Sequence, residues 1–145
     1  MSDLAICTDR LRRDFRDVRA VDDLSLEVPR GVVFGFLGPN GSGKTTTIRL
    51  LLGLLRPTGG RAKVLGFDTQ GQPGEIRQRC GALLEHTGLY ERLSAEENLE
   101  FYGRVARLPS TPRKARVKEL LSGLGLWERR KEALGTWSRG MKQKI

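Results

Sequence analysis

The sequence predicts an α/β protein with a strand-rich first part, to about residue 90, and a helical second part. Three observations support this prediction. Residues 38–45 read GPNGSGKT and lie between a short apolar run and an apolar helix. Residues 4–28 contain two stretches with the composition of β-strands, and residues 94–97 read SAEE, a pattern that starts helices.

The first two expected strands form an antiparallel pair. They cover residues 4–15 and 20–28, and the second ends at the turn sequence Pro29-Arg30-Gly31. This pair forms an N-terminal β-subdomain.

Short apolar runs mark the interior of the first part. Residues 33–37 suit a strand that is buried on both faces, and residues 45–55 suit a buried helix that is stopped by Gly53 and Pro57. Further short elements are expected at residues 62–65, 75–79 and 81–84.

Two helices are expected in the second part. The Ser94 hydroxyl can accept a hydrogen bond from the Glu97 amide while the Glu97 carboxylate reaches back to Ser94, which makes a capping box. This helix runs to about Arg107 and stops before Pro109. The next helix covers about residues 111–123 and has a proline in its first turn.

The composition is that of an ordinary globular protein, with 145 residues, 38% hydrophobic residues, 30% charged residues and a mean hydropathy of −0.39. No apolar run approaches the roughly 18 residues that span a membrane, and the N-terminus lacks the apolar core of a secretory signal. We therefore expect a location in the cytosol. Cys7 and Cys80 are far apart in sequence and are expected to be free thiols.

The formal net charge of +9 comes entirely from residues 104–145, which hold 12 Lys/Arg and 3 Asp/Glu. A nucleic-acid-binding protein can carry such a charge. Here the basic residues are not interleaved with aromatic ones, and no recognition motif accompanies them. A solvated helical face or a contact with an acidic partner is the preferred interpretation, and we expect no nucleic-acid partner.

The strongest chemical signal is the stretch from Gly38 to Thr45, which matches the phosphate-binding pattern G-x-x-x-x-G-K-[ST]. Glycines allow consecutive backbone N–H groups to turn inward around a polyphosphate, and the following helix N-terminus adds a partial positive charge. Lys44 would bind the β- and γ-phosphates, and the Thr45 hydroxyl would ligate Mg²⁺. The sequence therefore predicts a nucleotide-phosphate site.

Two other classes of protein share this loop. Asp68-Thr69-Gln70-Gly71 matches the D-x-x-G of GTPases, but it lies only 23 residues beyond Thr45 and no guanine-reading N-K-x-D occurs. A small-molecule kinase would leave the N-terminal strand pair and the stretch Trp137-Ser138-Arg139-Gly140-Met141 unexplained.

From about residue 4 to residue 145 the chain resembles the nucleotide-binding domain of an ABC transporter. The resemblance is carried by FRDVRAVDDLSLEVPRGVVFGFLGPNGSGKTT, by the Leu65–Asp68 sequence LGFD after PTGG, and by LLEHTGLY with ENL after it. The last of these is similar to the bacterial export-type subunits of drug, antibiotic or polysaccharide efflux. The resemblance implies a P-loop NTPase core sheet, the N-terminal antiparallel β-subdomain and an α-helical subdomain, with an ATP-binding core at about 1–90 and the helical subdomain at about 91–145.

The resemblance also implies an ATP site. Phe15 would stack on the adenine ring, where only the aromatic face is used, and Val21 would pack near the ring or the sugar. Thr46 would add an α-phosphate contact. The loop residues of this site are Gly38, Pro39, Asn40, Gly41, Ser42, Gly43, Lys44, Thr45 and Thr46.

Glu85 occupies the position of the family's Mg²⁺-ligating Gln. A carboxylate still binds a hard cation through oxygen, and its added negative charge predicts a tighter dependence of ATP binding on Mg²⁺. The neighbouring His86 is the only histidine. It is expected to be an exposed loop residue and not the family's switch histidine, which lies far downstream.

Ser138, Arg139, Gly140 and Met141 occupy the family's signature, commonly L-S-G-G-Q. The resemblance implies that Ser138 and Gly140 present a hydroxyl and a backbone amide at a helix N-terminus to the ATP of a second nucleotide-binding domain, in a head-to-tail dimer. Arg139 would add a cation near that phosphate or would be solvated.

The family continues with an apolar strand ending in Asp-Glu and then a histidine, and these are absent before Ile145. We expect a truncated domain that lacks the C-terminal part of the core and binds ATP without efficient turnover, so no catalytic residue is assigned.

The sequence thus predicts the ATP-binding subunit of an export-type ABC transporter. It would use ATP and Mg²⁺, work with a membrane-spanning subunit and a second nucleotide-binding domain, and lie on the inner face of the cell membrane. A soluble ABC-type ATPase of translation or DNA repair and a non-hydrolysing nucleotide-binding fragment are the alternatives.

Overall fold

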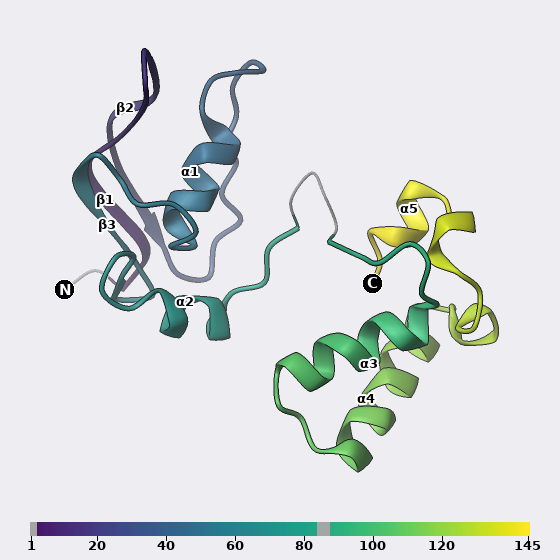
Figure 1. The fold of residues 1–145 in the computed structure, drawn as a ribbon. Helices are drawn as coiled ribbons and strands as arrows, with labels where there is room; N and C mark the ends of the chain where they lie inside the picture. Colours follow the sequence, from purple (N-terminus) through teal and green to yellow (C-terminus); the bar gives the residue numbers. More distant parts are fainter. Residues whose placement is uncertain (1–2, 84–87) are drawn as a thin grey trace. The chain divides into compact units, whose positions relative to one another are not determined.

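The computed structural model describes residues 3–83 and 88–145, and the chain divides into two compact units (Figure 1). The N-terminal unit comprises Met1–Ala82 and the helical unit comprises Leu83–Ile145. The α/β class predicted from the sequence is confirmed, with strands and short helices in the first unit and α-helices and 3₁₀ turns among the described residues of the second.

The N-terminal unit is built on an antiparallel sheet with the strand order β2-β1-β3-β4. The strands are β1 (Leu4–Phe15), β2 (Val18–Pro29), β3 (Gly59–Val64) and β4 (Phe67–Asp68). The predicted strand pair is therefore confirmed. The buried side chain of Thr8 on β1 joins this strand to β2. Its Oγ1 donates to the Leu24 carbonyl at 2.8 Å and accepts from the Leu26 amide at 2.9 Å.

The helix after the phosphate-binding loop covers one face of this sheet. Helix α1 (Lys44–Leu51) packs Leu50 against Leu11, Val21 and Ala62, and all four side chains are buried. Burial of a Leu or Val side chain stabilises a fold by about 1.5–3 kcal/mol. The sheet and α1 thus share a single apolar core.

Helix α1 ends four residues earlier than the sequence pattern predicts. Gly53 takes a left-handed φ of +64°, and a Cβ there would lie 2.7 Å from the Thr69 carbonyl oxygen. This backbone turn stops the helix, because a side chain would strain it and collide with the neighbouring loop. Helix α2 (Pro73–Arg79) follows, and its Ile76 is fully buried.

The predicted buried strand at residues 33–37 is wrong. These residues have no regular secondary structure, and Val33 and Leu37 are exposed. Residues 81–83 are likewise irregular, and the last residue predicted for that strand, Leu84, lies outside the described residues. A strand needs a neighbouring strand to satisfy its backbone groups, and within residues 3–83 and 88–145 neither segment pairs with one.

The helical unit consists of three α-helices and two single 3₁₀ turns among its described residues. They are α3 (Ala95–Val105), α4 (Ser110–Gly123), η1 (Trp127–Arg129), η2 (Leu134–Thr136) and α5 (Arg139–Lys142). Helices α3 and α4 lie side by side (Figure 1). The core of the unit contains the buried side chains Ala95, Val117, Leu121, Leu126, Leu134 and Trp137.

The predicted capping box at the start of α3 is present. The Ser94 Oγ accepts from the Glu97 amide at 3.2 Å, and the Glu97 carboxylate accepts from the Ser94 amide at 2.8 Å and from the Ser94 hydroxyl at 2.7 Å. The buried side chain of Asn98 continues the network, because its Oδ1 accepts from the Tyr90 amide and its Nδ2 donates to the Tyr90 and Ser94 carbonyls. The entry of the chain into α3 is therefore fixed by side-chain hydrogen bonds.

Replacing Ser94 by alanine should lower the free energy of unfolding by about 1 kcal/mol, because the Glu97 amide loses its cap and the Glu97 carboxylate loses a donor. Urea unfolding followed by far-ultraviolet circular dichroism measures this change. Ser122→Ala on α4 is the control, because the exposed Ser122 side chain makes no hydrogen bond among the described residues, and it should shift stability little. Equal effects of the two substitutions would contradict the role of the cap.

The stability of the helical unit should fall in acid. The hydrogen bonds from the Ser94 amide and hydroxyl hold the pKa of Glu97 below its ordinary value of 4.5. A carboxyl with a lowered pKa in the folded state stabilises fully above its unfolded pKa, and this stabilisation is lost as the pH falls through the folded value.

We expect urea unfolding between pH 7 and pH 3 to show a smaller acid loss in Glu97→Gln than in the native chain. Some loss remains, since the hydrogen bond from Arg129 also lowers the pKa of Glu132. Glu128→Gln removes a carboxylate that has no ion pair among the described residues and is the matched control. An unchanged pH profile in Glu97→Gln would exclude Glu97 as the titrating group.

Candidate nucleotide-binding site

The loop at residues 38–43 lies directly before α1, and two of its glycines are required by the backbone. Gly41 and Gly43 have φ values of +83° and +86°, in the left-handed region that side chains disfavour. A Cβ at Gly43 would lie 2.1 Å from the Ala20 carbonyl oxygen, and a Cβ at Gly38 would lie 2.6 Å from the Ser42 Oγ. The loop therefore keeps its shape only with glycine at positions 41 and 43, whereas a side chain at position 38 would displace the Ser42 hydroxyl.

The ammonium of Lys44 lies inside this loop. Its Nζ donates to the Gly38 carbonyl at 2.7 Å and to the Pro39 carbonyl at 2.6 Å, with the Ser42 Oγ at 3.5 Å. The first turn of α1 contains no acidic residue, so its partial positive charge is not offset there. A concave backbone with an ammonium at its centre and a helix N-terminus beside it fits a polyphosphate.

The remaining loop residues surround this position. Asn40 and Ser42 are exposed, and Thr45 and Thr46 lie half-buried in the first turn of α1. Lys44 and Thr45 also border an apolar cavity of about 430 Å³, whose other walls are Ile6, Leu26, Phe34, Phe36, Thr47, Ile48 and Leu51. The contacts predicted for Asn40, Thr45 and Thr46 with phosphate and Mg²⁺ stay predictions.

Phe15 lies at the end of β1, where β1 pairs with β2 through Phe15 and Val18. The side chain is 40% exposed, and the guanidinium carbon of Arg13 lies 4.4 Å from the ring centroid. An exposed aromatic ring of this kind can stack on a base. The sequence prediction singled out Phe15 but missed Arg13, although an arginine two residues earlier on the same strand was a visible signal.

Val21 belongs to the core that joins the sheet to the loop. It is buried in the cluster with Leu11, Leu50 and Ala62, and its Cγ2 would lie 3.5 Å from a Cβ at Gly43. Its predicted contact with the adenine ring or the sugar stays a prediction. The packing of Val21 places β2 directly against the phosphate-binding loop.

A charged cluster holds the β1–β2 hairpin that carries Phe15. The Asp14 carboxylate accepts from Arg12 Nε at 2.8 Å and from Arg19 Nε at 3.2 Å, and the Thr58 hydroxyl lies 3.3 Å away. Desolvation raises the pKa of Asp14, but the hydrogen bond and charge of Arg12, with the bonds from Arg19 and Thr58, outweigh it and hold the pKa below 3.8. Asp14 is therefore ionised at neutral pH and binds both strands of the hairpin.

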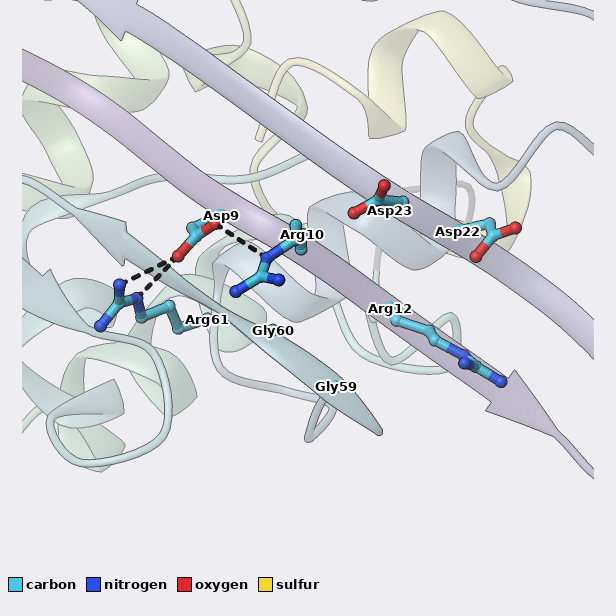
Figure 2. Close-up of a pocket in the computed structure, with 8 residues that line it drawn as sticks. All are labelled: Asp9, Arg10, Arg12, Asp22, Asp23, Gly59, Gly60 and Arg61. Carbon is cyan, nitrogen blue, oxygen red and sulfur yellow. Dashed lines mark hydrogen bonds and ion pairs between the residues drawn. The ribbon is translucent and has the colours of Figure 1, made fainter.

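A separate cavity of about 680 Å³ lies on the sheet (Figure 2). Its lining has three carboxylates, three guanidiniums and two glycines, from Asp9, Arg10, Arg12, Asp22, Asp23, Gly59, Gly60 and Arg61. Asp9 forms ion pairs with Arg61 at 3.0 Å and with Arg10 at 3.5 Å. The cavity shares no residue with the phosphate-binding loop, and its charges compensate one another.

The signature segment lies at the start of α5. Ser138 caps this helix, because its Oγ accepts from the Met141 amide at 3.3 Å, while Arg139 and Gly140 are exposed. Trp137 is buried in the core, and Met141 packs against that core and approaches Arg129 Nη1 with its sulfur at 3.5 Å. The helix N-terminus predicted for this segment is confirmed, and its contact with a second nucleotide stays a prediction.

Glu85 and His86 lie outside the described residues. Among residues 3–83 and 88–145, no group of three or more His, Cys, Asp or Glu side chains could hold a metal ion. Cys7 and Cys80 are free thiols, as predicted. Within the same residues, none of the helices has the length and apolar character needed to cross a membrane.

Comparison with known proteins identifies the family. The family model described as "ABC transporter" matches residues 21–145. The chain is 42% identical over 146 residues to the ABC transporter ATP-binding protein NatA of Bacillus subtilis (strain 168), an alignment that covers 100% of this chain and 59% of NatA. It is also 42% identical over 141 residues to the daunorubicin/doxorubicin resistance ATP-binding protein DrrA of Streptomyces peucetius, covering 97% of this chain and 43% of DrrA.

A solved structure agrees at the level of the fold. CbiO1 from Clostridium perfringens, part of the ABC transporter complex CbiONQ, matches with a TM-score of 0.80 at 22% identity, over 99% of this chain and 59% of CbiO1. The chain spans about half the length of the curated relatives it matches. Because the family match extends over residues 21–145 and includes the loop around Lys44, the chain belongs to the ABC transporter family.

Proposed function

We propose that this chain is the ATP-binding part of an export-type ABC transporter and binds Mg-ATP to drive transport through a membrane-spanning partner. The observation that carries the proposal is the glycine loop wrapped around the Lys44 ammonium, whose Nζ lies 2.7 Å from the Gly38 carbonyl and 2.6 Å from the Pro39 carbonyl. The names of NatA and DrrA, both ATP-binding proteins, support the ligand, and the resistance named for DrrA supports export.

The loop would bind the phosphates by an exchange of partners. In the structure the Lys44 ammonium donates to carbonyl oxygens, which are weaker acceptors than ionised phosphate oxygens. A bound triphosphate would take over these hydrogen bonds and accept further ones from the backbone N–H groups of residues 41–46. Phe15 would hold the adenine ring, and Thr45 and Glu85 would hold Mg²⁺, which neutralises phosphate charge.

The helical unit would contact the membrane-spanning subunit through an exposed aromatic cluster. Tyr90, Phe101 and Tyr102 are 49%, 39% and 41% exposed, and their ring centroids lie between 5.0 and 6.4 Å apart. The Tyr102 hydroxyl donates to the Gly88 carbonyl at 2.6 Å, which orders the cluster before any partner binds. Exposed aromatic groups of this kind are typical of protein interfaces.

The proposed assembly is a head-to-tail pair of nucleotide-binding domains on the inner face of the cell membrane. The assignment of residues 1–90 to the ATP-binding core and of 91–145 to the helical subdomain belongs to this proposal. Ser138, Arg139 and Gly140 are exposed, as contact with the second domain's ATP requires. Met141 would support this surface from the core side, where it is half-buried.

Mg-ATP should stabilise the native chain by about 2.7 kcal/mol at a hundredfold excess over its dissociation constant. Lys44→Ala should weaken binding about tenfold or more, because a charged hydrogen-bond donor to the phosphates is lost. Thermal unfolding with and without Mg-ATP measures the stabilisation, and isothermal titration calorimetry measures the two affinities. Lys63→Ala, an exposed lysine on β3, is the matched control. Native affinity in Lys44→Ala would contradict the site.

The same titration without Mg²⁺, in native and Glu85→Gln protein, tests whether Glu85 makes ATP binding depend more strongly on Mg²⁺.

Phe101→Asp should abolish co-purification with the membrane-spanning subunit and leave Mg-ATP affinity unchanged, because a carboxylate in the aromatic cluster would be desolvated in the interface. The measurement is affinity purification after co-expression of both subunits. Leu124→Asp, an equally drastic change at an exposed apolar residue outside the cluster, should leave the complex intact. Retention of the partner by Phe101→Asp would exclude this surface.

A further inference from the structure

We infer that Arg13 is a positioning residue for the nucleotide base, because its guanidinium supports one face of Phe15 and holds the ring ready to receive the base on its exposed part. This inference rests on the proposed function, in which Phe15 stacks on adenine. It adds a residue that the sequence prediction did not assign to the site.

The stacking geometry is direct. Arg13 and Phe15 are two residues apart on β1, so their side chains leave the strand on the same face. The guanidinium carbon lies 4.4 Å from the ring centroid, within the roughly 6 Å at which a cation is attracted by the π face of an aromatic ring. A guanidinium below the ring and a purine above it would form a three-layer stack.

A hydrogen bond fixes the guanidinium to the segment that leaves α1. Arg13 Nη1 donates to the Arg56 carbonyl at 2.8 Å. The same segment is held to β1 by the Thr58 amide, which donates to the Arg12 carbonyl at 2.8 Å. Helix α1 begins at Lys44, the lysine of the phosphate-binding loop. Through Arg56, Arg13 therefore connects Phe15 to the segment that follows this helix.

The charge of Arg13 is not neutralised by a carboxylate. The neighbouring Arg12 and Arg19 both form ion pairs with Asp14, whereas Arg13 has no ion pair in the described part of the chain. Its Nε is shielded from solvent and has no hydrogen-bond partner among those residues. The guanidinium is thus partly shielded from solvent and has no carboxylate partner in the described part of the chain, so the ring of Phe15 is a main partner of this side chain.

The test compares a ligand that has a base with one that lacks it. Calorimetric titration of the full chain with Mg-ATP and with Mg-tripolyphosphate gives the two dissociation constants. Arg13→Gln should weaken Mg-ATP binding about fivefold and change tripolyphosphate binding less than about twofold. Arg13→Lys, which keeps a cation, should recover part of the loss.

Two further variants separate stacking from general charge and from folding. Arg16→Gln removes the same charge next to Phe15, and Arg16 has no polar partner among the described residues, so it should leave both affinities nearly unchanged. In a Phe15→Leu background, Arg13→Gln should cause little additional loss of ATP affinity, because the ring through which Arg13 acts is gone. Preserved tripolyphosphate binding also demonstrates that each variant is folded.

The inference is overturned if Arg13→Gln weakens ATP and tripolyphosphate equally, or if its full effect persists in Phe15→Leu. It is also overturned if the native chain binds ATP and tripolyphosphate with equal affinity and Phe15→Leu does not change its ATP affinity. In that case the proposed phosphate site would remain. Failure of the native chain to bind either ligand would instead refute the proposed function and this inference with it.

Discussion

A Cβ at Gly43 would lie 2.1 Å from the Ala20 carbonyl oxygen, so the phosphate-binding loop meets β2 at a point where only glycine fits. This close approach sets the position of α1, because the helix begins at the next residue. It also sets the core, since Leu50 on α1 then reaches Leu11, Val21 and Ala62 on the sheet. The close approach at Gly43 therefore connects the loop, α1 and the sheet in the N-terminal unit.

The contact between Gly43 and β2 also fixes the glycine loop relative to the hairpin that carries Phe15. Ala20 and Val21 on β2 lie against the loop, while Phe15 lies at the hairpin between β1 and β2. The Asp14 cluster and the Arg13 bond to Arg56 hold that hairpin to the rest of the unit. Because Phe15 and the glycine loop are joined by packed and hydrogen-bonded elements, a nucleotide that binds them as proposed would have little of the unit left to order.

The helical unit uses a different kind of constraint. Its turns are fixed by buried polar groups with complete hydrogen bonds, such as Asn98, and by the capping box of Ser94 and Glu97. Trp137 fills the core directly before the signature segment, and Ser138 then caps α5. A large buried side chain next to an exposed polar segment gives that segment a rigid base, as the proposed contact with a second domain would require.

Features that depend on neighbours along the chain could be predicted from the sequence. The glycine loop and its lysine, the capping box at Ser94, and the strand pair at residues 4–15 and 20–28 were all predicted, because turn geometry, caps and hairpins act within a few residues. Three features are visible only in the folded chain: the exposure of residues 33–37, the burial of Val21 in the core, and the placement of Arg13 on Phe15 with its bond to Arg56. These features depend on which distant segments come together: an apolar run becomes a buried strand only beside a partner strand, and a guanidinium takes its role from the ring and carbonyl that folding brings to it.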